Sequence, residues 1–145
     1  RLERAFAASG IAIRERAIVL PSLSHPDYLR VNRVCDAMVD TLHWSGGNTS
    51  LDALACGLPI VTLPGRFMRS RQSAGMLTSM AVVETIAVDA DDYVRIATRL
   101  VREQDFRASI SARIAAQRTA LFDDARTAGW REGAPPRQAP HCACF

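Results

Sequence analysis

Short apolar runs separated by helical stretches constrain the fold of this chain more than any other feature. Continuous apolar residues at 17–20, 37–39 and 59–63 predict three buried strands, and a further apolar stretch covers 82–88. Strands that are apolar on both faces are typical of parallel sheets covered on both sides. Strands alternating with helices therefore predict an α/β fold, a Rossmann-like parallel sheet with helices on both faces.

Helical spacing and capping residues set the expected helices. These are a helix from Leu2 ending at Gly10, one over 24–33 with Ser24 as N-cap, one over 51–56 closed by Gly57, one over 69–80, one capped by Asp89, and a last one through Leu121. Periodicity is lost after Asp124. We therefore divide the chain into a domain at 1–124 and a loose C-terminal tail at 125–145, which we expect to be dispensable for folding.

The composition argues against several classes of function. The net charge is only +3, and the basic residues, all of them Arg, are scattered rather than striped, unlike a nucleic-acid interface. No window approaches the ~20 apolar residues of a membrane span, and no signal peptide is expected.

The cysteines do not indicate a metal site or a disulfide framework. Cys35 and Cys56 lie in apolar context and are expected in the core. Cys142 and Cys144 lie beside His141 in the Pro-rich tail, where folded structure to hold a metal is not expected. We therefore predict no metal site.

A glycine loop at 45–50, with the sequence Ser-Gly-Gly-Asn-Thr-Ser, follows the second predicted strand. Adjacent Gly46 and Gly47 allow close approach of a ligand, and the helix start behind them offers free N–H groups. Asn48 and Thr49 add donors, so the loop is a candidate diphosphate site. Alternatively, Thr49 and Asp52 have the spacing of a capping box, and residue spacing does not choose between the two.

A second loop, at 64–71, follows the third predicted strand and carries Arg66, Arg69 and Arg71. Three guanidinium groups at a strand end are suited to an anion. The same residues also fit a solvated helix start, and both interpretations stay open.

A set of residues at fixed spacing resembles the second catalytic half of glycosyltransferase family 41, which contains the O-GlcNAc transferases; the similarity covers about residues 10–124. The matching residues are Val39-Asp40-Thr41, Gly46, Thr49, Asp52, Ala53-Leu54, Gly57, Pro59, Val61-Thr62, Pro64-Gly65 and Ser70-Arg71. The stretch from Trp44 to Thr49 resembles a bacterial subgroup.

The resemblance implies the C-terminal domain of a GT-B glycosyltransferase, with a UDP-sugar bound in the cleft between two Rossmann-like domains. The implied roles are Asn48 and Thr49 on the diphosphate, Asp52 on the ribose, and Ser22 and Leu23 at the uracil. The remaining implied UDP-binding positions are His25, Arg30, Gly46 and Gly47. The family's catalytic lysine would precede this chain, so no catalytic residue is expected within it.

The chain departs from the family at three positions in this region. His25 stands in place of a lysine at the nucleoside, and Gly47 and Tyr28 stand in place of histidines. These replacements are expected to alter donor contacts.

The expected function is transfer of GlcNAc or another hexose from UDP to a protein side chain. The fragment is expected to be inactive alone, with its acceptor half and helical repeats upstream, no metal cofactor and a cytoplasmic location. The alternatives are a non-catalytic nucleotide-binding module and a GT-B enzyme of another family.

Overall fold

A parallel pair of strands, β1 (Met38–Val39) and β2 (Ile60–Val61), lies at the centre of the fold. Met38 pairs with Ile60 and Val39 with Val61. The chain continues from β2 into a parallel bridge between Thr62 and Ile86, which brings in the apolar stretch at 82–88. The predicted α/β fold with parallel strands is thus confirmed in the form of a small sheet.

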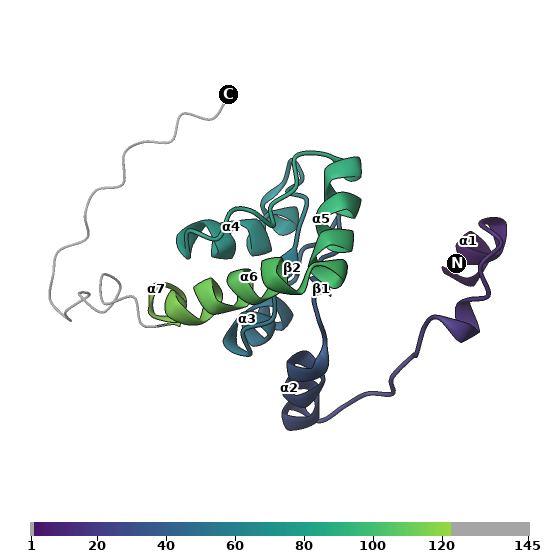
Figure 1. The fold of residues 1–145 in the computed structure, drawn as a ribbon, viewed down its shortest axis with the longest axis horizontal. Coiled ribbons are helices and arrows are strands. Elements are labelled where there is room, and N and C mark those ends of the chain that lie inside the picture. Colours follow the sequence, from purple (N-terminus) through teal and green to yellow (C-terminus); the bar gives the residue numbers. More distant parts are fainter. Residues whose placement is uncertain (1, 123–145) are drawn as a thin grey trace, which may run out of the picture.

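The computed structural model describes residues 2–122 (Figure 1). The predicted tail at 125–145, with its three possible metal ligands, lies outside this range. The remaining elements are α1 (Leu2–Ala8), the 3-10 turn η1 (Ile13–Glu15), α2 (His25–Val34), α3 (Asn48–Ala55), the 3-10 turn η2 (Met68–Ser70), α4 (Gln72–Ser79), α5 (Ala90–Arg102), α6 (Gln104–Ala116) and α7 (Arg118–Phe122).

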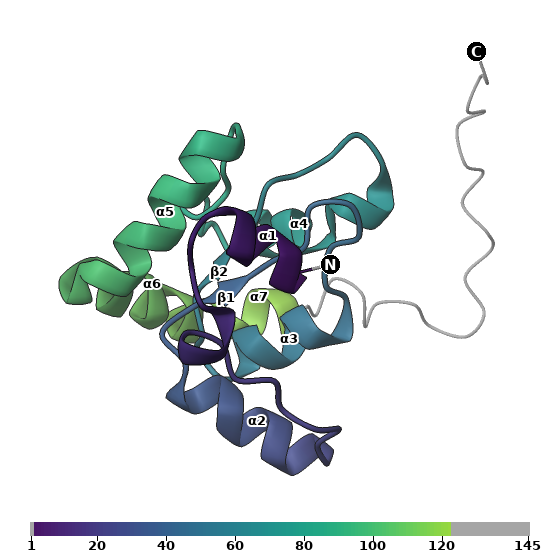
Figure 2. The same cartoon turned by 90° about the vertical axis from the view of Figure 1, so that its right-hand side faces the viewer.

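The core forms where α3, α5 and α6 meet the strands (Figure 2). α5 and α3 both contact β2, and α6 packs against both helices. Ile60 and Val61 are fully buried, as are Leu54 of α3 and Leu100 of α5. Burial of a Leu or Ile side chain contributes about 1.5–3 kcal/mol, so this cluster is what holds the strands in place.

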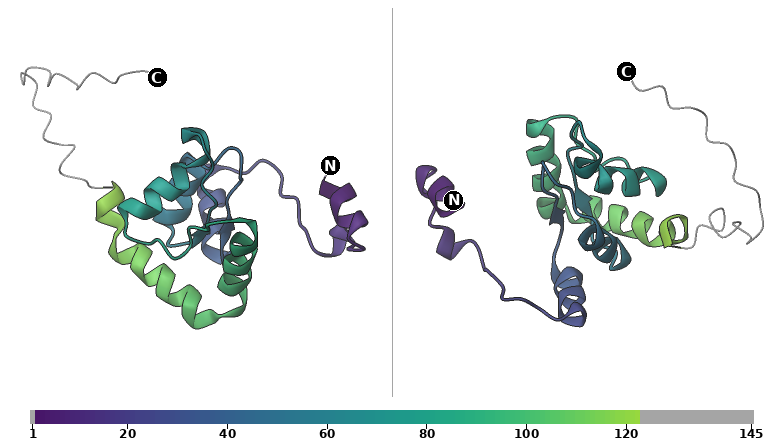
Figure 3. Two further views of the ribbon diagram at one scale, coloured as in Figure 1. Left: turned by 90° about the horizontal axis from the view of Figure 1, so that it is seen from above. Right: turned by 180° about the vertical axis from the view of Figure 1, so that it is seen from behind.

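The first predicted strand, 17–20, is wrong. This segment is extended but pairs with no described residue, and Ile18 and Val19 are 89% and 93% exposed. Figure 3 shows α1 set apart from the other helices and joined to α2 by this segment. Both N–H groups that β1 uses for pairing, those of Met38 and Asp40, point toward β2. The opposite edge of β1 is therefore free among residues 2–122.

Several helix boundaries differ from the sequence prediction. α3 begins at Asn48, three residues before the predicted start at 51, with Gly47 as its N-cap. The predicted helix at 69–80 is split into η2 and α4 at Arg71, whose φ and ψ of −129° and 4° interrupt the helix. Cys35 is exposed at the end of α2 rather than in the core, and Cys56 is only partly buried.

Candidate functional site

Two loops lie side by side at the carboxyl end of the strands, the edge where open α/β sheets bind ligands. The chain leaves β1 at Asp40 and runs through the glycine loop into α3. It leaves β2 into the arginine loop at 64–71. The backbone N–H of Ser45 donates to the carbonyl of Arg69 at 2.8 Å, which joins the two loops directly.

A buried carboxylate, Asp40, holds the glycine loop against the sheet. It is only 4% exposed. Its Oδ2 accepts from the hydroxyls of Ser45 and Thr62, both at 2.7 Å, and its Oδ1 accepts from the N–H of Thr41 at 3.0 Å and of Gly46 at 2.8 Å. Four donors offset the cost of burying this group without an ion pair.

Three serines extend this network to α4. The hydroxyl of Ser73 lies 2.8 Å from those of both Ser45 and Ser50, and the Ser73 N–H donates to the Ser45 oxygen at 2.9 Å. All three serines are buried. Because Ser45, Ser50 and Ser73 come from the glycine loop, α3 and α4, the network fixes the loop from both sides.

Glycine is required at position 46. A Cβ there would lie 2.3 Å from Ser50 Oγ and 2.8 Å from Thr49 Oγ1. At Gly47 a Cβ would meet only the end of the Gln72 side chain, at 3.0 Å. The structure therefore explains the first glycine by packing, while the second leaves room in front of α3.

The start of α3 presents unused hydrogen-bond donors. Within residues 2–122, the backbone N–H groups of Gly47, Asn48 and Thr49 have no acceptor, and neither do the side chains of Asn48 and Thr49. Asn48 and Thr49 are exposed. Three backbone donors and two side chains at the positive end of a helix are what an anionic oxygen cluster needs.

The capping-box interpretation of Thr49 and Asp52 is wrong. The N-cap is Gly47, so Thr49 already lies inside the helix and no side-chain cap is formed. The Asp52 carboxylate instead contacts a residue of α2, with its Oδ1 3.1 Å from Nε2 of His25. This contact joins α2 to α3 and leaves Oδ2 of Asp52 without a partner in the described part of the chain.

The other residues that the sequence places at the nucleoside, Ser22, Leu23 and Arg30, do not form one cluster with Asp52 and His25. Ser22 and Leu23 lie in the extended segment just before α2, with Ser22 exposed and Leu23 partly buried. Arg30 is one turn along α2 from His25 and donates to Asp27 at 2.6 Å. The structure thus brings His25 and Asp52 together and gives Arg30 a partner on its own helix.

The arginines of the second loop do not converge into one clamp. Arg71 donates to the carbonyl of Gly65 at 3.0 Å, and the guanidinium of Arg69 lies 4.8 Å from the centre of the Phe67 ring. Arg66 is exposed. Arg71 therefore stabilises its own loop, whereas the side chains of Arg66 and Arg69 lie on the surface.

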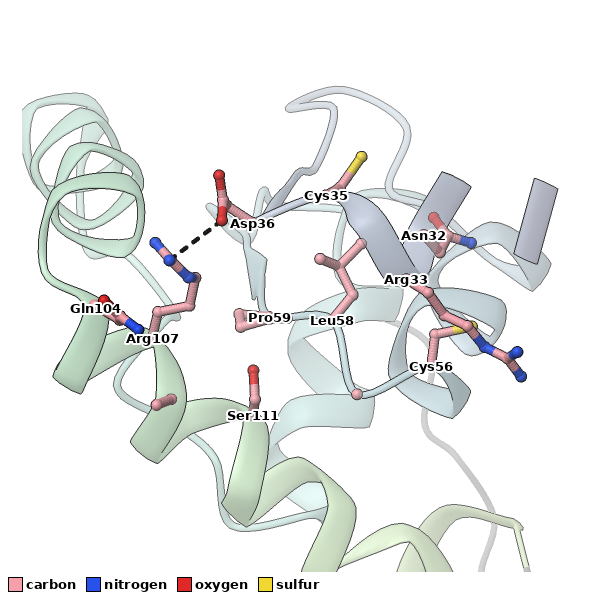
Figure 4. A pocket seen from close by; sticks show the side chains of 12 residues that line it. Asn32, Arg33, Cys35, Asp36, Cys56, Leu58, Pro59, Gln104, Arg107 and Ser111 are labelled. Atoms are coloured by element: carbon pink, nitrogen blue, oxygen red, sulfur yellow. Dashed lines mark ion pairs between the residues drawn. The ribbon is translucent and has the colours of Figure 1, made fainter. Parts of the chain in front are cut away.

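A cavity of about 300 Å³ lies at the opposite edge of the sheet, where the strands begin (Figure 4). Leu58 and Pro59 lie between α2 and α6 there, and the Arg107–Asp36 ion pair, 3.3 Å long, crosses one end. None of the predicted site residues lines this cavity. It is therefore separate from the candidate site.

The described residues, 2–122, hold neither a metal cluster nor a membrane-spanning helix. No group of three or more His, Cys, Asp or Glu residues there is placed to hold a metal ion. No helix of this part is long and apolar enough to cross a membrane.

Sequence reasoning missed the residues that build the loop. In the sequence, Asp40 is only one of the residues shared with the family, and no pattern singles out Ser73. The hydroxyl of Tyr93 in α5 also reaches Asp40 and donates to its backbone carbonyl at 2.5 Å. Burial, and secondarily the charge of Asp40, raise the pKa of Tyr93 above its ordinary value of 10.0. An acid directly after an apolar strand was the available signal.

Residues 2–128 match the family model described as Glycosyl transferase family 41. The chain belongs to this family. A UDP-N-acetylglucosamine–peptide N-acetylglucosaminyltransferase of Caenorhabditis elegans is 33% identical over 99 residues, covering 67% of this chain and 9% of that protein. One from Giardia intestinalis is 29% identical over 126 residues, covering 86% and 8%.

The fold agrees with the family. A mutant of Thermobaculum terrenum O-GlcNAc transferase superposes with a TM-score of 0.78 at 32% identity, over 86% of this chain and 24% of that one. The chain thus spans less than a tenth of the two curated relatives and about a quarter of the solved structure.

Proposed function

We propose that this chain is the nucleotide-sugar-binding domain of a GT-B glycosyltransferase that transfers GlcNAc or another hexose from UDP to a protein side chain. In this proposal residues 1–124 form the UDP-sugar-binding unit, one of two Rossmann-like domains with helices on both faces of the sheet. The relatives named above carry UDP-N-acetylglucosamine and peptide in their names, which supports this donor and this class of acceptor.

The observation that carries the proposal is the glycine loop, held by Asp40 in front of the free N–H groups of α3. In the proposed complex these groups and the side chains of Asn48 and Thr49 bind the diphosphate. Donors already fixed in place cost no reorganisation as charge develops on departing UDP, which is how such sites stabilise a transition state. No metal is required for this role.

Asp52 and His25 are proposed to bind the nucleoside. The free Oδ2 of Asp52 is suited to a ribose hydroxyl, while Oδ1 keeps its contact with His25. Since His25 belongs to α2, a nucleoside bound there also contacts the segment with Ser22 and Leu23, the proposed uracil side. Arg30 takes part only if it leaves Asp27.

Binding of nucleotides tests the proposal. Isothermal titration should show tighter binding of UDP than of ADP, GDP or UMP. Thr49→Ala should weaken UDP binding by about 1–3 kcal/mol, because one hydrogen bond to a charged group is lost. It should barely change the free energy of unfolding, because Thr49 is exposed and caps nothing. Equal affinity for all four nucleotides would contradict a uridine site.

A non-catalytic nucleotide-binding module is the second candidate. It would use the same glycine loop, α3 N–H groups and Asp52 to bind a nucleotide, without a reaction. Mixing the chain with the upstream half of the same protein distinguishes the two. Transfer from UDP-GlcNAc that appears only in the mixture supports the enzyme, and UDP binding without transfer supports the module.

A further inference from the structure

The glycine loop and the arginine loop run alongside each other in the same direction. Ser45 bonds to Arg69, and a Cβ built on Gly65 lies 3.7 Å from the carbonyl oxygen of Leu42. The intervening residue Trp44 therefore lies beside the turn at 66–68. The two loops thus lie next to each other at the carboxyl edge of the strands.

Large apolar side chains are exposed on these two loops. Trp44 is 67% exposed, Phe67 56% and Met68 81%. Arg69 covers one face of the Phe67 ring at 4.8 Å, a cation–π geometry that keeps a positive charge beside the ring. We call Trp44, Arg66, Phe67, Met68 and Arg69 the aromatic–arginine surface.

The charged side chains of the two loops are all positive. No Asp or Glu occurs at 41–51 or 63–83, whereas Arg66, Arg69 and Arg71 are all exposed. Of the two carboxylates nearest in the fold, Asp40 is buried and accepts from four donors, and Asp52 contacts His25 of α2 through its Oδ1. Within residues 2–122 none of these three arginines forms an ion pair, and guanidinium groups next to apolar side chains fit an acidic ligand that also has an apolar side chain.

The arginine loop is held in a fixed shape by its own bonds. The Gly65 N–H donates to the Ser70 carbonyl at 3.1 Å, the Ser70 hydroxyl donates to the Phe67 carbonyl at 2.8 Å, and Arg71 donates back to Gly65. A Cβ at Gly65 would lie 2.4 Å from Ser70 Oγ, so the turn is closely packed. A preformed surface loses less entropy when a ligand binds.

We propose that the aromatic–arginine surface binds an acidic segment of the acceptor protein with an apolar side chain beside its carboxylates. This inference rests on the proposed function, because it assigns the acceptor class to the edge where the sugar would be transferred. A short protein segment suits the surface better than a nucleic acid, since the arginines form one small cluster rather than a stripe.

Fluorescence of Trp44 tests the proposal. The variant Trp130→Phe leaves Trp44 as the single tryptophan of the chain. It is titrated with a twelve-residue peptide containing four Glu, one Leu and one Ser, and with a matched peptide in which each Glu is Gln. We expect at least about tenfold tighter binding of the acidic peptide at low salt, decreasing as salt is raised.

Surface variants locate the binding. Arg66→Glu with Arg69→Glu should weaken the acidic peptide at least tenfold, and Met68→Ser should weaken it several-fold without affecting folding, because Met68 is 81% exposed. The matched control, Arg102→Glu with Arg118→Glu, reverses two exposed arginines at the end of α5 and the start of α7 and should have no effect. Equal losses in the control would show that only net charge matters and would overturn the proposal.

Titration of the Trp130→Phe chain with UDP separates this inference from the proposed function. UDP binding without peptide binding refutes the acceptor surface alone, and peptide binding without UDP binding refutes the donor site alone. Tighter binding of oligo(dA) or of vesicles with anionic lipid than of the acidic peptide would overturn the proposal in favour of a nucleic acid or a membrane.

Discussion

Replacing Asp40 with alanine would remove a carboxylate that organises both loops of the site. Two backbone N–H groups and two hydroxyls would lose their acceptor in an environment where water has little access, since Asp40 is 4% exposed. Hydrogen bonds to a charged group contribute about 1.5–3 kcal/mol each, but they are not additive. The Ser45 hydroxyl can still donate to Ser73, whereas the Gly46 N–H has no alternative acceptor within the described residues.

We therefore expect Asp40→Ala to lower the free energy of unfolding by about 3–5 kcal/mol. Asp40→Asn should cost about 1–3 kcal/mol, because its oxygen can keep both backbone donors while the rotatable hydroxyls readjust to its amide. Urea unfolding followed by far-UV circular dichroism measures both. With a slope of about 2 kcal/mol per molar urea, 4 kcal/mol shifts the midpoint by about 2 M.

The matched control is Asp91→Ala, which removes an exposed acid from the first turn of α5 and should cost less than about 1 kcal/mol. A loss below about 1 kcal/mol for Asp40→Ala would refute the claim that this carboxylate holds the loop. Asp40→Ala should also weaken UDP binding, because the Gly46 N–H loses its acceptor and the glycine loop is no longer fixed, whereas Asp40→Asn keeps this bond and should weaken UDP binding less.

Three other outcomes are expected. Gly46→Ala should destabilise the fold and abolish UDP binding, because the added Cβ would lie 2.3 Å from Ser50 Oγ. In the control Gly75→Ala the added Cβ meets no atom within 4 Å, so this variant should be neutral or stabilising in thermal melts. The hydrogen bond from Arg113 holds the pKa of Glu84 below its ordinary value of 4.5. The small stabilisation from this exposed pair is therefore present above pH 4.5, and it disappears as the pH falls through the lowered pKa. An NMR titration of Glu84 should move toward 4.5 in Arg113→Ala. The purified chain alone should release no UDP from UDP-GlcNAc. Alignment of donor and acceptor lowers the reaction barrier by about 7–11 kcal/mol, and this alignment needs the proposed second domain. Turnover by the chain alone would contradict this expectation.

The sequence predicts the parts of the fold that depend on local signals. Ser24 and Asp89 cap α2 and α5 through the N–H groups of Asp27 and Asp92, and Gly57 closes α3 with a φ of +76°. These residues act within three or four positions of themselves, so their roles are visible in the chain order.

Features that depend on distant partners were not predictable in the same way. The run at 17–20 has the composition of a strand, but a strand also needs a neighbour, and none of residues 2–122 supplies one. The end of α4 also lacks its usual sequence signal, because Ala81 takes the left-handed conformation there, with a φ of +53°, that Gly or Asn normally adopts. The link between Ser45 and Ser73 spans 28 residues and has no local signature.

The exposed run Ile18-Val19-Leu20 and the open edge of β1 also affect how the chain behaves in solution. Within residues 2–122 neither the run at 18–20 nor the outer edge of β1 has a strand partner, and an exposed edge of this kind is a template to which a second copy can add a strand. Pro21 limits such a stack, because proline cannot donate to a further ladder. Work at high concentration would accordingly benefit from Val19→Lys, which places a charge in the aggregation-prone segment and leaves the glycine loop untouched.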